Sequence, residues 1–327
     1  MERAGQILRA LADGQFHSGE ELARRLGISR AAVWKQVARI RTTMGLPVQA
    51  VQGRGYRLSE PLELLDPEAI RDAILPGARG LLAELEVLDR IDSTNSHLMR
   101  RIDDGIDSGH ACLCEWQTAG RGRRGRPWIS PFGSNIYLSL YWSFPQAAAE
   151  LAGLSLVAGV NVVQGLERLG ITGVALKWPN DLLWEGRKLA GLLLEMRGEQ
   201  GGECRVVTGV GLNTRLRDDV GEAIDQPWID LHRLPGGQGL SRNRIAASVL
   251  GALLEGMARF QEQGFEPFRE SWCRYDRYLG RPVTLTLGSR RVMGIHRGVD
   301  YNGALLLQTT EGVRSYHGGE VSLRGKD

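Results

Sequence analysis

Apolar residues near the start of the chain recur every three or four positions, which is the spacing of one face of an α-helix. Three such stretches follow one another, at 7–11, 22–26 and 33–40. A capping box that begins at Ser18 opens the second stretch, Gly27 ends it, and Ser29 is placed to cap the third. The pattern therefore predicts three short helices whose apolar faces share a core, formed by Ile7, Leu8, Leu11, Leu22, Leu26, Val33, Val37 and Ile40.

A strand, a turn and a second strand are predicted directly after the third helix. Residues 48–51 and 56–58 have strand-like composition, and Gln52-Gly-Arg-Gly55 between them is a turn signal. A helix-turn-helix followed by such a hairpin is a winged helix, which binds DNA; the alternative is a helical bundle that makes protein contacts. In a DNA complex we expect the third helix in the major groove and the wing on the backbone, through Ser29, Arg30, Lys35, Gln36, Arg39, Arg54 and Arg57.

The charge of the chain is concentrated in this N-terminal segment. The net charge is +3 over 327 residues, but residues 1–62 alone carry +5 and the remaining 265 residues carry −2. A small basic module on a near-neutral body is typical of a protein that binds a polyanion, although solvated surface charge produces the same bias. Pro61 prevents the last strand from continuing, so we place the end of this DNA-binding domain at residue 62.

The composition argues against a membrane-spanning, secreted or disulfide-rich protein. Hydrophobic residues make up 42% and charged residues 24%, as in ordinary globular proteins. No apolar run approaches the roughly 20 residues that a membrane span needs, and the N-terminus lacks the apolar core of a secretory signal. The four cysteines are too few for a disulfide framework, and their spacing is not that of a zinc site. We therefore expect a cytoplasmic protein with no membrane association.

A loop rich in glycine and arginine lies near the middle of the chain. Gly120-Arg-Gly-Arg-Arg-Gly125 has the spacing of a dinucleotide-binding turn, but Pro127 and Pro131 prevent a helix from starting there. The flanking segments, 112–117 and 135–142, instead have the composition of strands. Arginines crowded on one flexible loop repel one another unless an anion binds, so the loop is a candidate phosphate site; the alternative is a solvated basic loop.

Three apolar segments further on are predicted as strands. Residues 175–184 and 188–195 are joined by the hairpin signal Glu185-Gly186-Arg187, and residues 206–213 contain glycines that indicate a close approach by a ligand or another backbone. Lys177 and Lys188 interrupt the first two strands. A buried ammonium is costly unless an anion pairs with it, so each lysine either faces an anionic ligand or points outward on a polar face.

Five sequence blocks, in order, resemble the signature of the biotin-protein ligases. Because a winged helix precedes them, the chain most resembles the bifunctional biotin-protein ligase and biotin operon repressor family, and the resemblance covers essentially the whole length. The blocks are Asp92-Ser-Thr-Asn95, Gln117-Thr-Ala-Gly-Arg-Gly-Arg-Arg-Gly-Arg126, Lys177-Trp-Pro-Asn-Asp181, Lys188-Leu-Ala-Gly191 and Gly209-x-Gly-x-Asn213.

The resemblance implies a two-step reaction. Such ligases join biotin to ATP as biotinyl-5'-adenylate, with Mg²⁺ as cofactor, and pass biotin to a lysine of a biotin carboxyl carrier protein. It implies catalytic roles for Lys188, Arg123 and Asp181, with Asp181 also a candidate Mg²⁺ ligand. The implied biotin-binding residues are Ser93, Thr94, Asn95, Gln117, Gly120, Arg121, Gly122, Arg123, Lys188 and Gly191; the implied adenylate-binding residues are Arg121, Arg124, Arg126, Trp128, Lys177, Asn180, Asn213 and Trp228.

The same resemblance implies regulation. The adenylate would act as corepressor, promote a homodimer and so place two winged helices on operator DNA of biotin synthesis genes. Two alternatives remain open at this point, a repressor that senses biotin without turnover and a lipoate-protein ligase of related architecture.

The remainder of the chain completes the fold class. Ser241 is placed to cap a long helix that reaches Phe260, and a further helix is predicted near 265–278. Short strands then follow from Arg281, as in a small SH3-like barrel, and His317-Gly-Gly-Glu320 fits either a tight turn of that barrel or an arm toward the ligase site. We predict an α+β multidomain protein: a winged helix-turn-helix over 1–62, a central mixed-sheet ligase domain with helices over 63–278, and an SH3-like β-barrel over 279–327.

Overall fold

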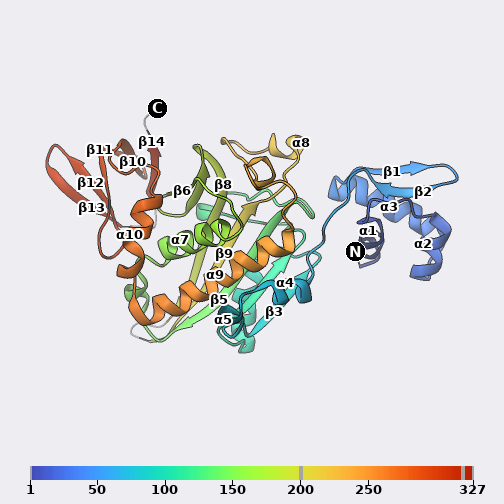
Figure 1. The fold of residues 1–327 in the computed structure, drawn as a ribbon, viewed down its shortest axis with the longest axis horizontal. Coiled ribbons are helices and arrows are strands. Elements are labelled where there is room, and N and C mark those ends of the chain that lie inside the picture. The colour runs from blue at the N-terminus through green and yellow to red at the C-terminus, as the bar shows by residue number, and fades with distance from the viewer. Residues whose placement is uncertain (1, 199–201, 318–320, 326–327) are drawn as a thin grey trace.

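The computed structural model describes residues 2–198, 202–317 and 321–325 of the chain, and Figure 1 shows an N-terminal, a central and a C-terminal part. The predicted turn at His317-Gly-Gly-Glu320 lies mostly outside the described residues. Among those residues, none of the helices combines the length and the apolar character that a bilayer crossing needs.

The N-terminal part is the predicted winged helix-turn-helix. Ser18 Oγ accepts a hydrogen bond from Glu21 N at 3.0 Å, and Ser29 Oγ accepts one from Ala32 N at 3.1 Å. Gly27 ends the second helix with a φ of 61°, a left-handed conformation that favours glycine. The elements are α1 (Glu2–Leu11), α2 (Gly19–Leu26), α3 (Arg30–Met44), β1 (Val48–Val51) and β2 (Gly55–Leu58), with β1 and β2 antiparallel.

The core of the N-terminal part extends into the central part. Phe132 follows the glycine- and arginine-rich loop in sequence, yet its ring is 3% exposed and belongs to the N-terminal hydrophobic cluster. Leu62, Leu64 and Trp116 pack against the same cluster. The winged helix is therefore held to the central part by apolar contacts as well as by the linking chain.

The central part is built on a mixed sheet in the order β3-β4-β5-β9-β8-β7-β6. Strands β3 and β4 are parallel, and the other neighbours in the sheet are antiparallel. The elements are α4 (Pro67–Ala73), α5 (Pro76–Arg79), β3 (Glu84–Leu88), α6 (Thr94–Arg101), β4 (His110–Cys114), β5 (Asn135–Phe144), α7 (Leu154–Glu167), β6 (Val174–Lys177), β7 (Asp181–Trp184), β8 (Arg187–Gly198), β9 (Cys204–Asn213), α8 (Asp218–Gly221), α9 (Arg242–Gln263) and α10 (Glu266–Tyr275).

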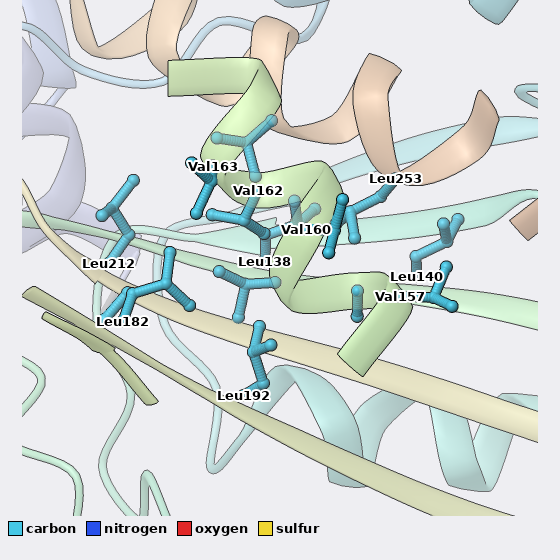
Figure 2. Close-up of a cluster of buried hydrophobic side chains, with 14 of the residues drawn as sticks. Leu138, Leu140, Val157, Val160, Val162, Val163, Leu182, Leu192, Leu212 and Leu253 are labelled. Carbon is cyan, nitrogen blue, oxygen red and sulfur yellow. The ribbon is translucent and has the colours of Figure 1, made fainter. Parts of the chain in front are cut away.

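The two faces of this sheet have different partners. Figure 2 shows Leu138 and Leu140 of β5 directed toward Val157 and Val160 of α7, in the main hydrophobic core, to which α9 also contributes. Strand residues alternate between faces, and Tyr141 of β5 accordingly packs with α6 in a separate cluster on the other side. The same alternation places Ser139, between Leu138 and Leu140, on the α6 face.

The C-terminal part is an antiparallel sheet in the order β13-β12-β11-β10-β14. The predicted run of short antiparallel strands is confirmed, and the closure of these strands into an SH3-like barrel stays a prediction, because in the described residues the end strands β13 and β14 do not pair with each other. The bulge in β11 between His296 and Val299 bends the sheet. The elements are β10 (Pro282–Leu287), β11 (Arg290–Val299), β12 (Leu305–Thr309), β13 (Gly312–Tyr316) and β14 (Val321–Gly325).

Candidate active site and DNA-binding surface

The polar N-terminal end of α6 lies against the middle of the central sheet. Gln117 Oε1 accepts hydrogen bonds from the backbone N of Thr94 at 2.9 Å and from its hydroxyl at 3.2 Å. Ser139 of β5 donates to Asn95 Oδ1 at 2.6 Å and contacts the Thr94 hydroxyl at 2.7 Å. Ser93, the N-cap of α6, is also buried. Three predicted biotin-binding residues, Thr94, Asn95 and Gln117, thus share one hydrogen-bonded group, and Ser93 lies next to it in the chain.

The residue before this group anchors the start of α6. Arg100 donates to both carboxylate oxygens of Asp92, at 2.8 and 2.9 Å, and Asp92 also accepts from Ser93 N at 2.8 Å. These hydrogen bonds lower the pKa of the Asp92 carboxyl from 3.8 to about 2. Asp92 therefore stays ionised and holds the first turn of α6 in place.

The glycine- and arginine-rich loop folds back on itself over the sheet. Trp128 N donates to Gly120 O at 2.9 Å, Gly122 N donates to Arg126 O at 2.8 Å, and Arg121 and Pro127 form an isolated β-bridge. A side chain at Gly120 would overlap its surroundings, because a Cβ there would lie 2.5 Å from Ser130 Oγ and 2.8 Å from Trp128 O. Glycine at this position is therefore required by the fold of the loop itself.

The glycines of β9 admit two side chains of the site. A Cβ on Gly209 would lie 2.2 Å from Asn95 Oδ1, and a Cβ on Gly211 would lie 2.4 Å from the Trp128 ring. A Cβ on Gly191 of β8 would lie 3.2 Å from the Trp128 ring, so Trp128 covers this glycine too. The sequence indicates a ligand or a backbone at these glycines; the structure instead places the Asn95 and Trp128 side chains there.

The predicted single strand over residues 175–184 is wrong. The segment forms two antiparallel strands, β6 and β7, with Lys177 opposite Asp181. The turn between them contains Pro179, which has no N–H to donate, and Asn180, whose side chain donates to Leu192 O at 2.9 Å. This hairpin turns Lys177 back toward Asp181, with 3.9 Å between Lys177 Nζ and Asp181 Oδ2.

Lys188 reaches the same place from β8. Its Nζ lies 2.8 Å from Asp181 Oδ1 and 5.6 Å from the centre of the Trp128 ring. The register between β7 and β8 shifts at Leu189, so that Leu189 and Ala190 both enter the hydrophobic core. The bulge places Lys188 on the same face of the sheet as Gly191, which strict alternation would not do.

Two arginines of the loop contact this cluster. Arg123 Nη1 donates to Asn180 Oδ1 at 3.2 Å, and Arg121 Nη2 donates to the Glu195 carboxylate at 2.8 and 2.9 Å. Burial and the neighbouring Arg124 lower the pKa of Arg123, and Asp181 opposes them. The loop therefore contacts the β6–β7 turn through Arg123 and β8 through Arg121.

Four predicted adenylate-binding residues lie outside this contact group. Asn213 is buried, and its side chain donates to Ile229 O at 3.1 Å, so its amide supports the segment beside Lys188. The Trp228 side chain packs on Gly221, and the Arg233 guanidinium lies 4.7 Å from the centre of the Trp228 ring. Only the backbone of Trp228 reaches Lys188, with which it forms an isolated β-bridge. Arg124 and Arg126 are exposed, and within the described ranges neither hydrogen-bonds to the cluster.

Asp181 does not fit the role of Mg²⁺ ligand. Its carboxylate oxygens face the ammonium groups of Lys188 and Lys177, which would repel a divalent cation. Over the part of the chain that the structure describes, no three His, Cys, Asp or Glu side chains are grouped to hold a metal ion. The structure therefore makes Asp181 the counter-ion of the two lysines.

The predicted DNA-binding residues lie on α3 and the wing. Arg30, Lys35 and Arg39 are exposed, whereas Ser29 caps the helix. Gln36 is half-buried, and its Oε1 is enclosed by protein. In the wing the guanidinium groups of Arg54 and Arg57 lie 4.1 and 4.7 Å from the centre of the Phe16 ring.

Three family models match successive parts of the chain. A model of the biotin/lipoate A/B protein ligase family matches residues 87–213, a helix-turn-helix model matches 3–57, and a model of the C-terminal domain of biotin protein ligases matches 278–324. The bifunctional ligase/repressor BirA of Salmonella typhimurium is 43% identical over 98% of this chain and 97% of its own length. The chain belongs to the bifunctional ligase/repressor family. BirA of Escherichia coli is 41% identical with the same coverage.

A solved structure of a biotin protein ligase has a similar fold over three quarters of this chain. The biotin protein ligase of Aquifex aeolicus, determined in complex with biotin and ATP, is 29% identical to this chain with a TM-score of 0.65. The match covers 75% of this chain and 100% of the Aquifex protein.

Within the ligase/repressor fold, sequence reasoning missed Ser139, Ser96 and Glu195. Ser139 is buried and lies between two apolar residues of a predicted strand. A serine at such a position is the sequence signal that could have identified it as part of the site. Ser96 accepts a short hydrogen bond from Arg121, and Glu195 accepts two from the same arginine. Nothing in the local pattern predicted these two, because Arg121 lies far from both in sequence.

Proposed function

We propose that the chain is an ATP-dependent biotin-protein ligase that also represses transcription. The observation that carries the ligase proposal is the convergence of Lys188, Arg123 and Asp181, from three separate segments, beside the polar end of α6. A site for a carboxylate and a nucleotide phosphate needs fixed cations next to neutral polar groups, and this cluster supplies both.

Biotin would lie on the α6 face of the sheet. Its ureido group needs short hydrogen-bonding partners, which Ser93, Thr94 and Gln117 offer at the start of the helix. Arg121 and Arg123 would close over it with the loop, and Gly120, Gly122 and Gly191 leave space for close approach. Asn95 has its amide satisfied by protein groups and would act by fixing the pocket.

In the first step, a biotin carboxylate oxygen would attack the α-phosphorus of ATP, and the bond to pyrophosphate would break. Negative charge builds on the phosphoryl oxygens, where Lys188 and Arg123 stabilise it. Lys177, Asn180, Arg124 and Arg126 would hold the phosphates, and Trp128 or Trp228 would cover the adenine. Because the mixed anhydride reacts with water, the folded loop would protect it.

In the second step, the amine of a lysine on a biotin carboxyl carrier protein would attack the acyl carbon, and AMP would leave. The amine must lose a proton, and the Asp181 carboxylate is the acidic group nearest Lys188. Asp181 would orient the amine and accept its proton, while Lys188 would remain on the acyl-phosphate oxygens.

The repressor proposal rests on the winged helix. Arg30, Lys35 and Arg39 share one helix whose apolar side is packed away, so the basic side is free for DNA. By this proposal the partner is operator DNA of biotin synthesis genes, read as a two-fold site by a homodimer.

The homodimer is proposed to form when biotinyl-adenylate binds. Strand β7 pairs with β8 only as far as Gly191, so in the described residues the outer edge of β8 beyond Leu192 has no strand neighbour. Met196 on this stretch is 50% exposed. Such an edge can pair with a second copy. Sedimentation should show dimers at saturating adenylate; monomers under those conditions would exclude this part of the proposal.

The test of the ligase proposal uses the full chain with labelled biotin, ATP and a biotin carboxyl carrier domain, with lipoate as competitor. We expect pyrophosphate release and labelled carrier that lipoate does not suppress. Binding of biotin without pyrophosphate release would identify a non-catalytic sensor, and label transfer from lipoate alone would identify a lipoate-protein ligase.

A further inference from the structure

A carboxylate on β8 joins two parts of the site that are distant in sequence. Glu195 accepts two hydrogen bonds from Arg121 Nη2, at 2.8 and 2.9 Å, and one from Asn95 Nδ2 at 2.9 Å. The Glu195 and Arg121 side chains are 28% and 34% exposed, so both are mostly removed from water. Glu195 therefore links the glycine- and arginine-rich loop to α6.

The α6 end of this link is rigid. Asn95 also donates to Leu193 O at 3.1 Å and accepts from Ser139 at 2.6 Å. Its side chain fills the space that glycine leaves at position 209. Because Asn95 is fixed on three sides, Glu195 is held in one position, and Arg121 has a fixed anion to bind.

The loop end of the link controls the position of Trp128. Arg121 pairs with Pro127 in a β-bridge, and the next residue is Trp128, which covers Gly211 and Lys188. Arg121 also donates a short hydrogen bond to Ser96. Loss of the Glu195 carboxylate would leave the Arg121 guanidinium without its anion, and the closed loop would become less stable.

We propose that Glu195 is a positioning residue for the ligase reaction, which holds the loop closed over the site by binding Arg121 against Asn95. The effect of Glu195 on catalysis rests on the proposed function, but the tether, which is the link from Arg121 through Glu195 to Asn95, is a property of the fold. Glu195 contacts no reacting atom in the proposed mechanism, so its effect should fall on biotin binding and not on the chemical step.

A second ion pair on the same strand provides the matched control. Arg197 Nη1 lies 3.0 Å from Asp103, and the two side chains are 48% and 69% exposed. Exposed pairs of this kind contribute little to stability. Asp103→Asn therefore removes one carboxylate beside β8, as Glu195→Gln does, without touching the loop.

The first measurement needs no ligand and no ligase activity. Trypsin cleaves after arginine unless proline follows, so the rate of cleavage after Arg123 and Arg124 reports how often the loop opens. Glu195→Gln should accelerate this cleavage about tenfold, because a charge-assisted hydrogen bond to the closed form is lost. Asp103→Asn should leave it unchanged. Cleavage of Glu195→Gln at the wild-type rate would overturn the proposal.

The second measurement separates positioning from a merely structural role. In the ligase assay, Glu195→Gln should raise the KM for biotin about tenfold and leave kcat within about twofold. A fall in kcat with unchanged KM would overturn the positioning role. If wild-type protein transfers no biotin while cleavage of Glu195→Gln is still accelerated, the proposed function fails and the tether stands.

A double-mutant cycle distinguishes loss of the Glu195–Arg121 interaction from a general folding defect. Arg121→Gln alone should accelerate loop cleavage as Glu195→Gln does, and the double variant should be no faster than either. Additive acceleration would show that the two residues act independently and would overturn the proposal.

Discussion

The indole Nε1 of Trp178 donates a hydrogen bond to the backbone carbonyl of Gly303, at 3.0 Å. This bond crosses from the β6–β7 turn of the central part to the turn before β12 of the C-terminal part, and Trp178 is 2% exposed. Pro179 O accepts a further bond from Ser155 at 3.0 Å. The turn that carries Lys177, Asn180 and Asp181 is therefore held from both sides.

Trp178→Phe should weaken the hold of the C-terminal part on this turn. Phenylalanine keeps a ring in the core but leaves the buried Gly303 carbonyl without its donor, at a cost of about 1–3 kcal/mol. Urea unfolding should show this loss. Because the turn positions catalytic groups, kcat for biotin transfer should also fall, by about tenfold.

Trp184→Phe is the matched control for that variant. Trp184 lies on β7 of the same hairpin, half-buried and with Arg187 5.3 Å from its ring centre. Its replacement should change kcat by less than about twofold. Equal losses in the two variants would show that the Trp178–Gly303 bond has no specific role.

Lys188→Ala should suppress biotin transfer by about 10²–10³-fold, because it removes the cation proposed to stabilise charge on the acyl-phosphate oxygens. Circular dichroism should be unchanged and the winged helix should stay folded, since it does not contact Lys188. Arg187→Ala removes an adjacent exposed cation and should leave turnover near normal. Near-normal turnover of Lys188→Ala would remove the assignment.

The elements with local signals could be predicted from the sequence. Ser29 and Ser241 each accept the capping hydrogen bond that begins the predicted helix, from Ala32 N at 3.1 Å and from Arg244 N at 3.2 Å. Helical caps depend on residues within one turn, so sequence spacing is sufficient to find them. The five ligase-like blocks were identified by their resemblance to a known family, and three of them meet at Asp181, Lys188 and Arg123.

The features that depend on register could not be predicted. Leu189 is one apolar residue among many on β8, yet the bulge there decides that Lys188 faces the site. Gly209 and Gly211 were recognised as points of close approach, but only the fold shows that Asn95 and Trp128 occupy them. Such contacts join segments far apart in sequence, and no local pattern records them.

Gly211→Ala should displace the Trp128 ring. A Cβ at position 211 would lie 2.4 Å from that ring, well inside van der Waals contact, so the indole must move off β9. Overpacking of this kind costs about 1–3 kcal/mol, visible in urea unfolding. The KM values for biotin and ATP should rise together, because Trp128 covers Lys188 and is proposed to cover the adenine.

Gly77→Ala tests whether any added methyl group has this effect. Gly77 lies in α5, and no atom lies within 4 Å of the Cβ that alanine would add. The Gly77→Ala variant should have the wild-type KM values for biotin and ATP, and its stability should be unchanged or slightly raised. Wild-type KM values in Gly211→Ala would mean that Trp128 does not position substrates.

Arg39→Ala should weaken operator binding and leave ligase activity unchanged. Arg39 is exposed on α3, where it is proposed to meet DNA, and it lies in a different part of the chain from Lys188. Removal of a major-groove contact should lower affinity for the operator more than affinity for unrelated DNA, measured by binding titrations with both. Arg168→Ala removes an exposed arginine that pairs with Glu255, far from the winged helix, and should bind DNA normally. Unchanged operator affinity in Arg39→Ala would mean that another side of α3 contacts DNA.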